Sequence, residues 1–172
     1  MQKTLINVRR NLRERFRKAE RTAILGVGSE LMGDDGAGML AAQKIHERLD
    51  KLFMDKRAKV FFGATTPENL TGEIRNYNPT HVIIIDSADL GEKLGSITLL
   101  SPEQENCASC STNRLPLKLL TNYLHNSLRC ESTIIAIQPE MLGFDVPPSK
   151  CICDACEHLA EILADILKNP CG

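Results

Sequence analysis

The feature that most constrains the fold is a regular alternation of short apolar runs with longer amphipathic segments along 172 residues. Apolar runs of this kind are typical of strands buried on both faces, and their alternation with helices favours a parallel sheet. We therefore expect an α/β fold, a three-layer sandwich in which helices cover both faces of a twisted, mostly parallel, five-stranded sheet. The expected strands are residues 22–27, 58–63, 81–89, 96–100 and 132–139, and the expected helices include 36–49, 115–128 and 154–168.

Two of the expected helices allow more detailed predictions. In the first, Leu40, Ile45 and Leu49 are expected to face inward, because their spacing places them on one side of a helix. A further short helix is expected to begin at Pro67, where a missing N–H costs nothing, with Thr66 as its cap.

Positive charge is concentrated in the first 21 residues. Residues 1–21 contain eight Lys or Arg and two Glu, a net charge of +6, so the remainder carries −7 to give the overall −1. We interpret residues 1–21 as a basic amphipathic helix docked on a single α/β domain formed by residues 22–172. A docking arm for an acidic partner is the alternative. The apolar stripe of this helix consists of Leu5, Val8, Leu12 and Phe16.

Composition excludes several classes of function. The net charge near zero gives no pull toward nucleic acid or lipid, and no aromatic platform accompanies the basic segment. No apolar run approaches the ~20 residues that a membrane span needs, and no secretory signal is recognisable. Seven cysteines, an odd number, argue against a fully paired disulfide framework and favour a reducing compartment. We expect a cytoplasmic monomer that binds neither nucleic acid nor membrane.

The segment ILGVGSELMGDDGAG joins the first expected strand to the first expected helix. Its glycines, Gly26, Gly28 and Gly33, do not have the spacing of a dinucleotide-binding turn. Asp34 and Asp35 also stand at a helix start, where their charge would repel a phosphate. Two carboxylates that face a crevice suit a cation instead. One of the two can cap the helix while the other points outward.

A third carboxylate follows the expected strand 81–89, because the apolar run HVIII is succeeded directly by Asp86. In parallel sheets, ligands bind beyond the carboxyl ends of the strands. The turn from Gly28 to Asp35 and Asp86 both lie at such ends, so they are expected to converge on one crevice. This predicts a metal site; the alternative for Asp86 is an ordinary turn former.

Five motifs, in order between Thr22 and Leu167, carry a family resemblance: GVGSELMGDDGAG, PEN, IIIDSADLG, STNRLPL and IQPEMLGF. With them the chain resembles the maturation endopeptidases of [NiFe] hydrogenases, most closely those serving hydrogenases of the formate-hydrogenlyase type. The resemblance implies a hydrolase that removes a C-terminal extension from the hydrogenase large-subunit precursor once nickel has been inserted. It also implies Ni²⁺ carried by the substrate rather than a serine, cysteine or aspartic protease constellation.

The family's metal-binding residues carry over one at a time. The acidic residue of the glycine turn matches Asp35, the strand-end Asp matches Asp86, and the position of the family His matches Asn113. The resemblance therefore implies that Asp35 and Asp86 are catalytic and bind the metal. Candidate substrate-binding residues are Gly28, Ser29, Thr112, Gln138 and Pro139.

Asn113 is the most informative departure from the family pattern. An amide oxygen is a weaker ligand than imidazole for a late divalent metal, so nickel affinity should fall unless another donor substitutes. None of the four histidines is a strong substitute, and His125 is the least implausible of them. The alternative function is a non-catalytic checkpoint or chaperone that binds the large subunit.

The cysteines suggest a second metal site. Two thiol clusters exist, and thiolates are ligands for zinc, for an iron–sulfur cluster or for another soft metal. Ordinary reduced thiols are the competing interpretation, and a metal-binding regulatory protein is the third functional hypothesis. The clusters are Cys107 with Cys110, and Cys151 with Cys153 and Cys156.

Overall fold

The computed structural model describes residues 2–51, 57–100 and 117–169, with the side chains of residues 2–4 and 118 excepted. The helices are α1 (Gln2–Phe16), α2 (Ala37–Lys51), α3 (Thr71–Tyr77), α4 (Leu117–Leu128) and α5 (Lys150–Lys168). Two 3₁₀ turns, η1 (Gly33–Gly36) and η2 (Pro67–Leu70), lead into α2 and α3. The strands are β1 (Thr22–Val27), β2 (Ala58–Ala64), β3 (His81–Ser87), β4 (Ile97–Leu99) and β5 (Glu131–Ile137).

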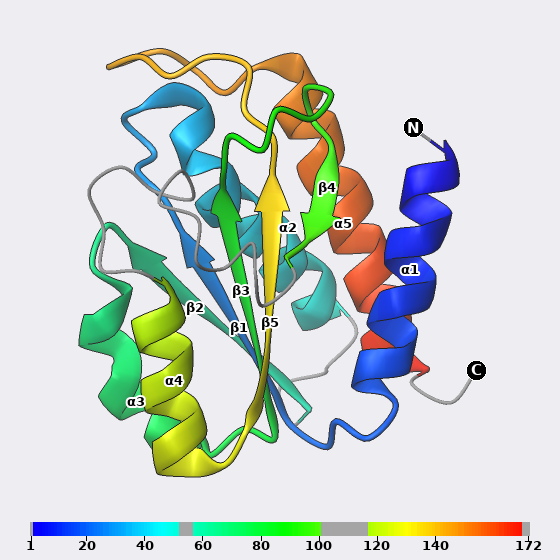
Figure 1. Cartoon of the computed structure of the whole chain (residues 1–172), viewed down its shortest axis with the longest axis vertical. Coiled ribbons are helices and arrows are strands. Elements are labelled where there is room, and N and C mark those ends of the chain that lie inside the picture. The colour runs from blue at the N-terminus through cyan, green and yellow to red at the C-terminus, as the bar shows by residue number, and fades with distance from the viewer. Residues whose placement is uncertain (1, 52–56, 101–116, 170–172) are drawn as a thin grey trace.

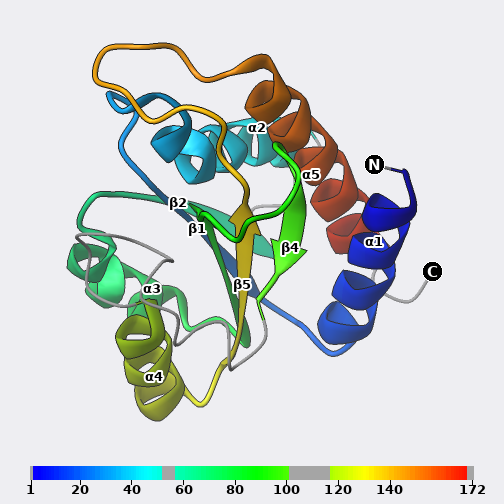
Figure 2. The same cartoon turned by 45° about the horizontal axis from the view of Figure 1, so that its top comes forward.

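The five strands form one sheet in the order β2-β1-β3-β5-β4. Four of them are parallel, and only β4 runs antiparallel, against β5 (Figure 1). Helices cover both faces: α3 and α4 lie on one side, while α1, α2 and α5 lie on the other, as the rotated view makes clear (Figure 2). The predicted three-layer sandwich with a mostly parallel sheet is confirmed.

The sheet separates two hydrophobic cores, and β3 shows why. All seven of its residues are buried, and successive side chains point to opposite faces. Ile83 and Ile85 pack toward α1, α2 and α5, whereas Val82 and Ile84 pack toward α3 and α4. A strand that is apolar on both faces fits only between two helical layers, which is how the sequence places β3 at the centre.

Two glycines allow α2 to lie very close to the sheet. A Cβ on Gly38 would lie 2.1 Å from the carbonyl oxygen of Ile85 and 2.2 Å from that of Val27. A Cβ on Gly26 would lie 2.6 Å from the Cβ of Ala42. Because α2 begins directly against the ends of β1 and β3, the turn before it is held over those strand ends.

The helix α1 packs along α5 and beside β4 (Figure 1). Val8, Leu12 and Phe16 of its expected apolar stripe are buried, and Leu5 is partly buried against them. On its polar side Arg13 donates to the carboxylate of Asp165 over 2.9 Å, and the guanidinium of Arg9 lies 3.5 Å from the same carboxylate. Within the described ranges, no helix is long and apolar enough to cross a membrane.

Some expected element boundaries were wrong. The helix α5 begins at Lys150, four residues before the predicted start, because Pro147 and Pro148 end the extended segment and Ser149 takes the N-cap position. Thr66 is the N-cap residue of η2, but its side chain makes no capping hydrogen bond. Its carbonyl oxygen accepts from the N–H of Asn69 instead.

Smaller differences concern strand lengths and one helix face. The third strand ends at Ser87 rather than residue 89, and β4 keeps only three of its five predicted residues. In α2, Ile45 and Leu49 are buried as predicted, whereas Leu40 is only partly buried.

Candidate active site

The glycine turn after β1 has a conformation that only glycine accommodates. Gly28 has a φ of 138°, and its N–H donates to the carbonyl oxygen of Ala64 over 2.9 Å. A Cβ at this position would lie 2.1 Å from the carbonyl oxygen of Asp35. The turn therefore folds tightly back on itself, and the carboxylate of Asp35 accepts a hydrogen bond of 2.9 Å from the N–H of Ser29.

Asp35 and Asp86 meet at one end of the sheet. The strands β1 and β3 are parallel neighbours, with Gly26 opposite Ile85, so their carboxyl ends are adjacent. Ser87 links the two carboxylates: its N–H donates to Asp86 Oδ1 over 2.9 Å, and its hydroxyl donates to Asp35 Oδ1 over 3.4 Å. Asp86 is buried and Asp35 only partly so. The two residues predicted to be catalytic thus belong to one hydrogen-bonded group.

Asp34 has a different task from its neighbour. Its buried carboxylate accepts hydrogen bonds from the N–H groups of Glu140, Met141 and Ser149 and from the Ser149 hydroxyl, over 2.6–2.9 Å. Burial alone would raise the pKa of Asp34, but the hydrogen bonds from Ser149, Met141 and Glu140 outweigh it and lower that pKa. The idea that one of the two aspartates caps the helix is corrected: Asp34 ties the segment between β5 and α5 to the glycine turn.

Gln138 organises the loop that follows β3. Its side-chain oxygen accepts from the N–H groups of Leu90 and Glu92 over 2.8 Å and 3.1 Å. Its amide nitrogen donates to Asp89 Oδ1 over 3.0 Å and to the carbonyl oxygen of Pro139 over 3.4 Å. The side chain is buried. Both ends of its amide are therefore engaged within the protein, and a role for Gln138 in binding substrate stays a prediction.

The structure brings together most of the predicted site that it describes. Asp35 and Asp86 are linked through Ser87, and the N–H of Ser29 donates to Asp35. Gly28 lies in the same turn, and Gln138 and Pro139 follow the neighbouring strand β5. Ser87 was missed, since nothing in the sequence marks a serine that bridges two carboxylates until β1 and β3 are known to be neighbours. Thr112, Asn113, Cys107 and Cys110 lie outside the described residues.

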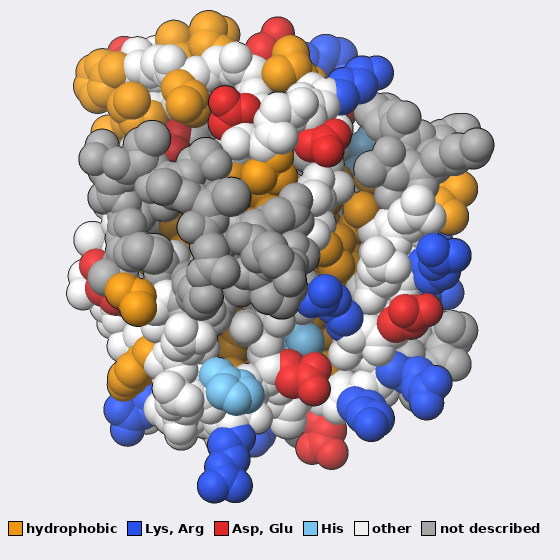
Figure 3. Space-filling view, in the orientation of Figure 1, with side chains coloured by type: hydrophobic (Ala, Val, Ile, Leu, Met, Phe, Trp, Pro, Cys, Tyr) orange, Lys and Arg blue, Asp and Glu red, His pale blue; other side chains and the backbone are white. Residues whose placement is uncertain are grey.

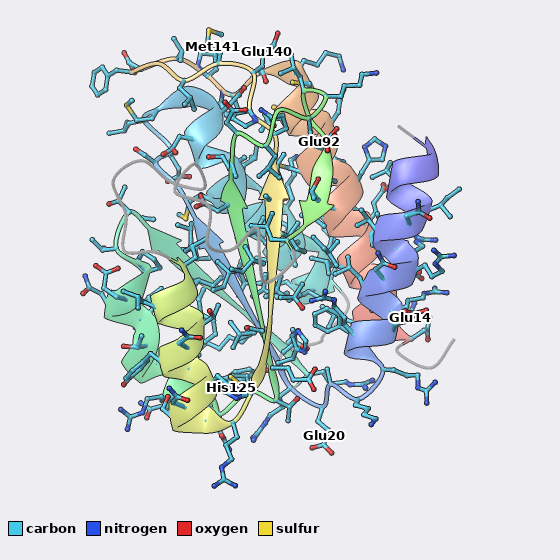
Figure 4. The ribbon with its side chains drawn as sticks, in the orientation of Figure 1. Glu14, Glu20, Glu92, His125, Glu140 and Met141 are labelled. Atoms are coloured by element: carbon cyan, nitrogen blue, oxygen red, sulfur yellow. The ribbon has the colours of Figure 1, made fainter. Side chains whose placement is uncertain are left out.

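His125 is wrong as a substitute for the family His. It lies at the end of α4, at the amino end of the parallel strands and far from the glycine turn (Figure 4). Its Nδ1 lies 3.1 Å from the carbonyl oxygen of Cys130. His81 begins β3 at that same end, where it is buried. Across the described ranges, no three His, Cys, Asp or Glu side chains are grouped so that they could hold a metal ion.

The described cysteines do not converge on a common point. Cys151, Cys153 and Cys156 all lie on α5, since that helix begins earlier than predicted. The Cys156 thiol is buried against the carbonyl oxygen of Ala37, and burial raises its pKa to about 12. The Cys151 thiol lies 3.1 Å from the hydroxyl of Ser149. The predicted thiol site therefore has no support from the part of the chain described.

Comparison with known proteins identifies the family. A model of the hydrogenase maturation protease family matches residues 43–166, which include Asp86 and exclude the glycine turn. The hydrogenase 3 maturation protease of Escherichia coli K12 is 33% identical over 141 residues, which cover 81% of this chain and 86% of the relative. The chain belongs to the hydrogenase maturation protease family. Proteins of this family are hydrolases of the endopeptidase class.

Solved structures agree with this assignment. A crystal structure of a [NiFe] hydrogenase maturation protease from Thermococcus kodakarensis superimposes with a TM-score of 0.83 at 28% identity, covering 92% of this chain and 99% of that one. The solution structure of an Escherichia coli endopeptidase of the same family gives a TM-score of 0.74 at 31% identity, covering 85% and 90% of the two chains. The family resemblance and the fold are thereby confirmed.

Proposed function

We propose that this protein is a nickel-dependent endopeptidase that removes the C-terminal extension of a [NiFe] hydrogenase large-subunit precursor after nickel insertion. The observation that carries the proposal is the group formed by Asp35, Ser87 and Asp86, where two carboxylates from different strand ends share one serine. Carboxylate oxygens bind divalent cations. The carboxylate of Asp35 is partly exposed and that of Asp86 is buried, so the pair offers one accessible and one buried oxygen ligand.

The reaction is hydrolysis of one peptide bond. The oxygen of a water molecule forms a bond to the scissile carbonyl carbon, the C–N bond breaks, and a proton passes to the leaving amine. A divalent ion lowers the barrier by polarising the carbonyl or by lowering the pKa of a bound water. The nickel is part of the substrate, so the role of Asp35 and Asp86 is to receive it and to fix the precursor against the site.

The donor set fits a metal that arrives with its substrate. Among the described residues the site offers two carboxylates, and Asn113, the counterpart of the family His, lies outside them. A divalent ion needs more donors than two side chains supply, and a nickel ion already ligated by the precursor brings its own. We infer that nickel bridges the two proteins only while the precursor is bound.

The second candidate is a non-catalytic checkpoint that binds the nickel-loaded large subunit. Asn113 in place of the family His is the observation that favours it, because an amide is the weaker nickel ligand. Both candidates use Asp35 and Asp86 to sense nickel. They differ in whether the C-terminal extension of the precursor is cleaved in the complex.

A cleavage assay tests the proposal. Nickel-loaded and nickel-free precursor are incubated with the unaltered protein and with Asp35→Asn, Asp86→Asn and Asn113→His variants, and the mass of the precursor is followed. We expect nickel-dependent loss of the tail, and a fall in rate of about a hundredfold or more for each aspartate variant. Glu92→Gln is the matched control, because Glu92 is an exposed carboxylate at the same end of the sheet (Figure 4).

Four results would count against the proposal. Cleavage of the nickel-free precursor at an equal rate would remove the nickel dependence. Cleavage by the Asn113→His variant alone, or nickel-dependent binding without cleavage, would favour the checkpoint. An Asp35→Asn variant as active as Glu92→Gln would show that the linked group is not the site.

A further inference from the structure

Large apolar side chains are exposed around one part of the molecule. Ten large hydrophobic residues are exposed within the described ranges, and five of them belong to just two short segments. One segment is the glycine turn, and the other joins β5 to α5. We name these five residues the apolar rim; they are 37–73% exposed and consist of Leu31, Met32, Met141, Leu142 and Phe144.

The two segments of the apolar rim are fixed to each other although more than 100 residues separate them. The N–H of Asp145 donates to the carbonyl oxygen of Leu31 over 2.8 Å, and the N–H of Asp34 donates to that of Met141 over 3.0 Å. The carboxylate of Asp34 adds the four hydrogen bonds described above. A Cβ on Gly33 would lie 2.9 Å from a methyl group of Val146, so the segments are also in close contact.

The apolar rim is therefore a preformed surface rather than a set of unrelated side chains. Figure 3 shows hydrophobic side chains gathered at the top of the molecule, over the segment between β5 and α5, and Figure 4 places Met141 there. Neither hydrophobic core includes any of the five. Clustered apolar side chains left in water by an otherwise well-packed protein mark an interaction surface.

The position of the apolar rim identifies its occupant. Leu31 and Met32 precede Asp35 in the same tight turn. Met141 lies beside Asp34, because its carbonyl oxygen accepts from the Asp34 N–H and its own N–H donates to the Asp34 carboxylate. A polypeptide whose scissile bond reaches Asp35 therefore comes close to this surface. We propose that the apolar rim binds an apolar segment of the large-subunit precursor and so contributes to substrate affinity. This proposal rests on the proposed function, because it takes the precursor to be what the site acts on.

The test compares two double variants. Leu142→Ser with Phe144→Ser removes the most exposed part of the apolar rim, and Ile6→Ser with Leu119→Ser is the control, since those side chains are 65% and 53% exposed on α1 and α4. Thermal unfolding first establishes that both fold. Binding of nickel-loaded precursor is then measured by calorimetry, and KM and kcat by the cleavage assay.

We expect the rim variant to raise both Kd and KM by about tenfold and to leave kcat within about twofold, because uniform binding affects KM alone. The control variant should match the unaltered protein. If the unaltered protein cleaves the precursor and both variants have the same Kd and KM, the rim proposal fails while the proposed function stands. If no protein cleaves but the rim variant alone loses binding, the rim proposal stands and the proposed function fails.

A second copy of the chain is the competing occupant. Sedimentation of the unaltered protein and of the rim variant separates the two cases. A monomer in both is the expected result. Self-association that disappears only in the rim variant, with precursor binding unchanged, would overturn the proposal.

Discussion

The two ends of the parallel sheet are built in opposite ways. At the carboxyl end, Asp35 and Asp86 share Ser87 beside exposed apolar loops. At the amino end, His81 is buried with its Nε2 2.9 Å from the hydroxyl of Thr133, and its ring centroid lies 4.3 Å from that of Phe16. Both ends contain polar groups bonded to one another. At the carboxyl end the carboxylate of Asp35 is only partly buried, whereas His81 at the amino end is buried.

The difference shows at which end of the sheet the candidate catalytic side chains lie. Helix α1 packs its last turn against the amino end, so a histidine there contributes to the core rather than to a site. The carboxyl end receives tight glycine turns and two loops that depend on each other. The following substitutions test this contrast, from the largest expected effect to the smallest.

Gly38→Ala should cause the largest loss of stability. Its Cβ would lie 2.1 Å from the Ile85 carbonyl oxygen, so α2 must move away from the strand ends. We expect the free energy of unfolding in urea to fall by about 4 kcal/mol. Gly72→Ala is the control, because a Cβ there has no atom within 4 Å, and it should stabilise α3 by about 0.5 kcal/mol. Equal stability of the two variants would contradict the close packing of α2.

Asp34→Asn should have the next largest effect, at the same end. The asparagine amide has the same shape, but only its oxygen can accept a hydrogen bond. Its NH₂ group would face N–H or O–H donors that bond to a carboxylate oxygen in the unaltered protein. We expect a loss of about 3 kcal/mol and faster amide exchange at Glu140 and Met141.

The control for this substitution is Asp145→Asn. Asp145 is exposed and lies in the same segment, and its side chain is not part of the Asp34 contacts. Unchanged exchange at Glu140 in Asp34→Asn would show that these hydrogen bonds do not hold the segment in place.

Acid should destabilise the amino end through His81. Burial, with a smaller contribution from Arg15, lowers the pKa of this histidine to about 4 from 6.5. As the pH falls through 6.5, His81 is protonated in the unfolded chain, but in the folded protein it stays neutral down to about pH 4. The unfolded state is therefore favoured and the stability falls. From about pH 7 to about pH 5 the expected loss is about 2 kcal/mol.

Urea unfolding at several pH values measures this loss. In His81→Gln the corresponding part of the pH dependence should disappear, whereas His125→Gln, which removes an exposed imidazole, should keep it. The same loss of pH dependence in both variants would contradict the assignment to His81.

The fold was largely predictable because its signals are local. Each buried strand is a short apolar run, and the rule that parallel strands end together brought Asp35 and Asp86 to one edge before any coordinates were known. The partners of Asp34 were not predictable: Glu140, Met141 and Ser149 offer backbone N–H groups, which any sequence offers. A contact of that kind depends on how two distant loops fold, and the types of the residues involved do not indicate it.

The early start of α5 was missed for a related reason. A run of cysteines without an apolar period looks like a loop, but α5 begins there because Ser149 takes the N-cap position, and Ser149 is bonded to Asp34. The cysteines then separate onto different sides of one helix, which a linear pattern of thiols does not reveal.

The Asp34–Ser149 contact also has a consequence for the order in which the molecule is assembled. The glycine turn is made early in synthesis, but the three backbone N–H partners and the hydroxyl partner of the Asp34 carboxylate come from residues 106 to 115 positions later. Contacts so distant along the chain slow folding, because the entropy of closing the long loop is lost before the contacts form. The turn that carries Asp35 therefore makes these contacts only after Ser149 has been synthesised.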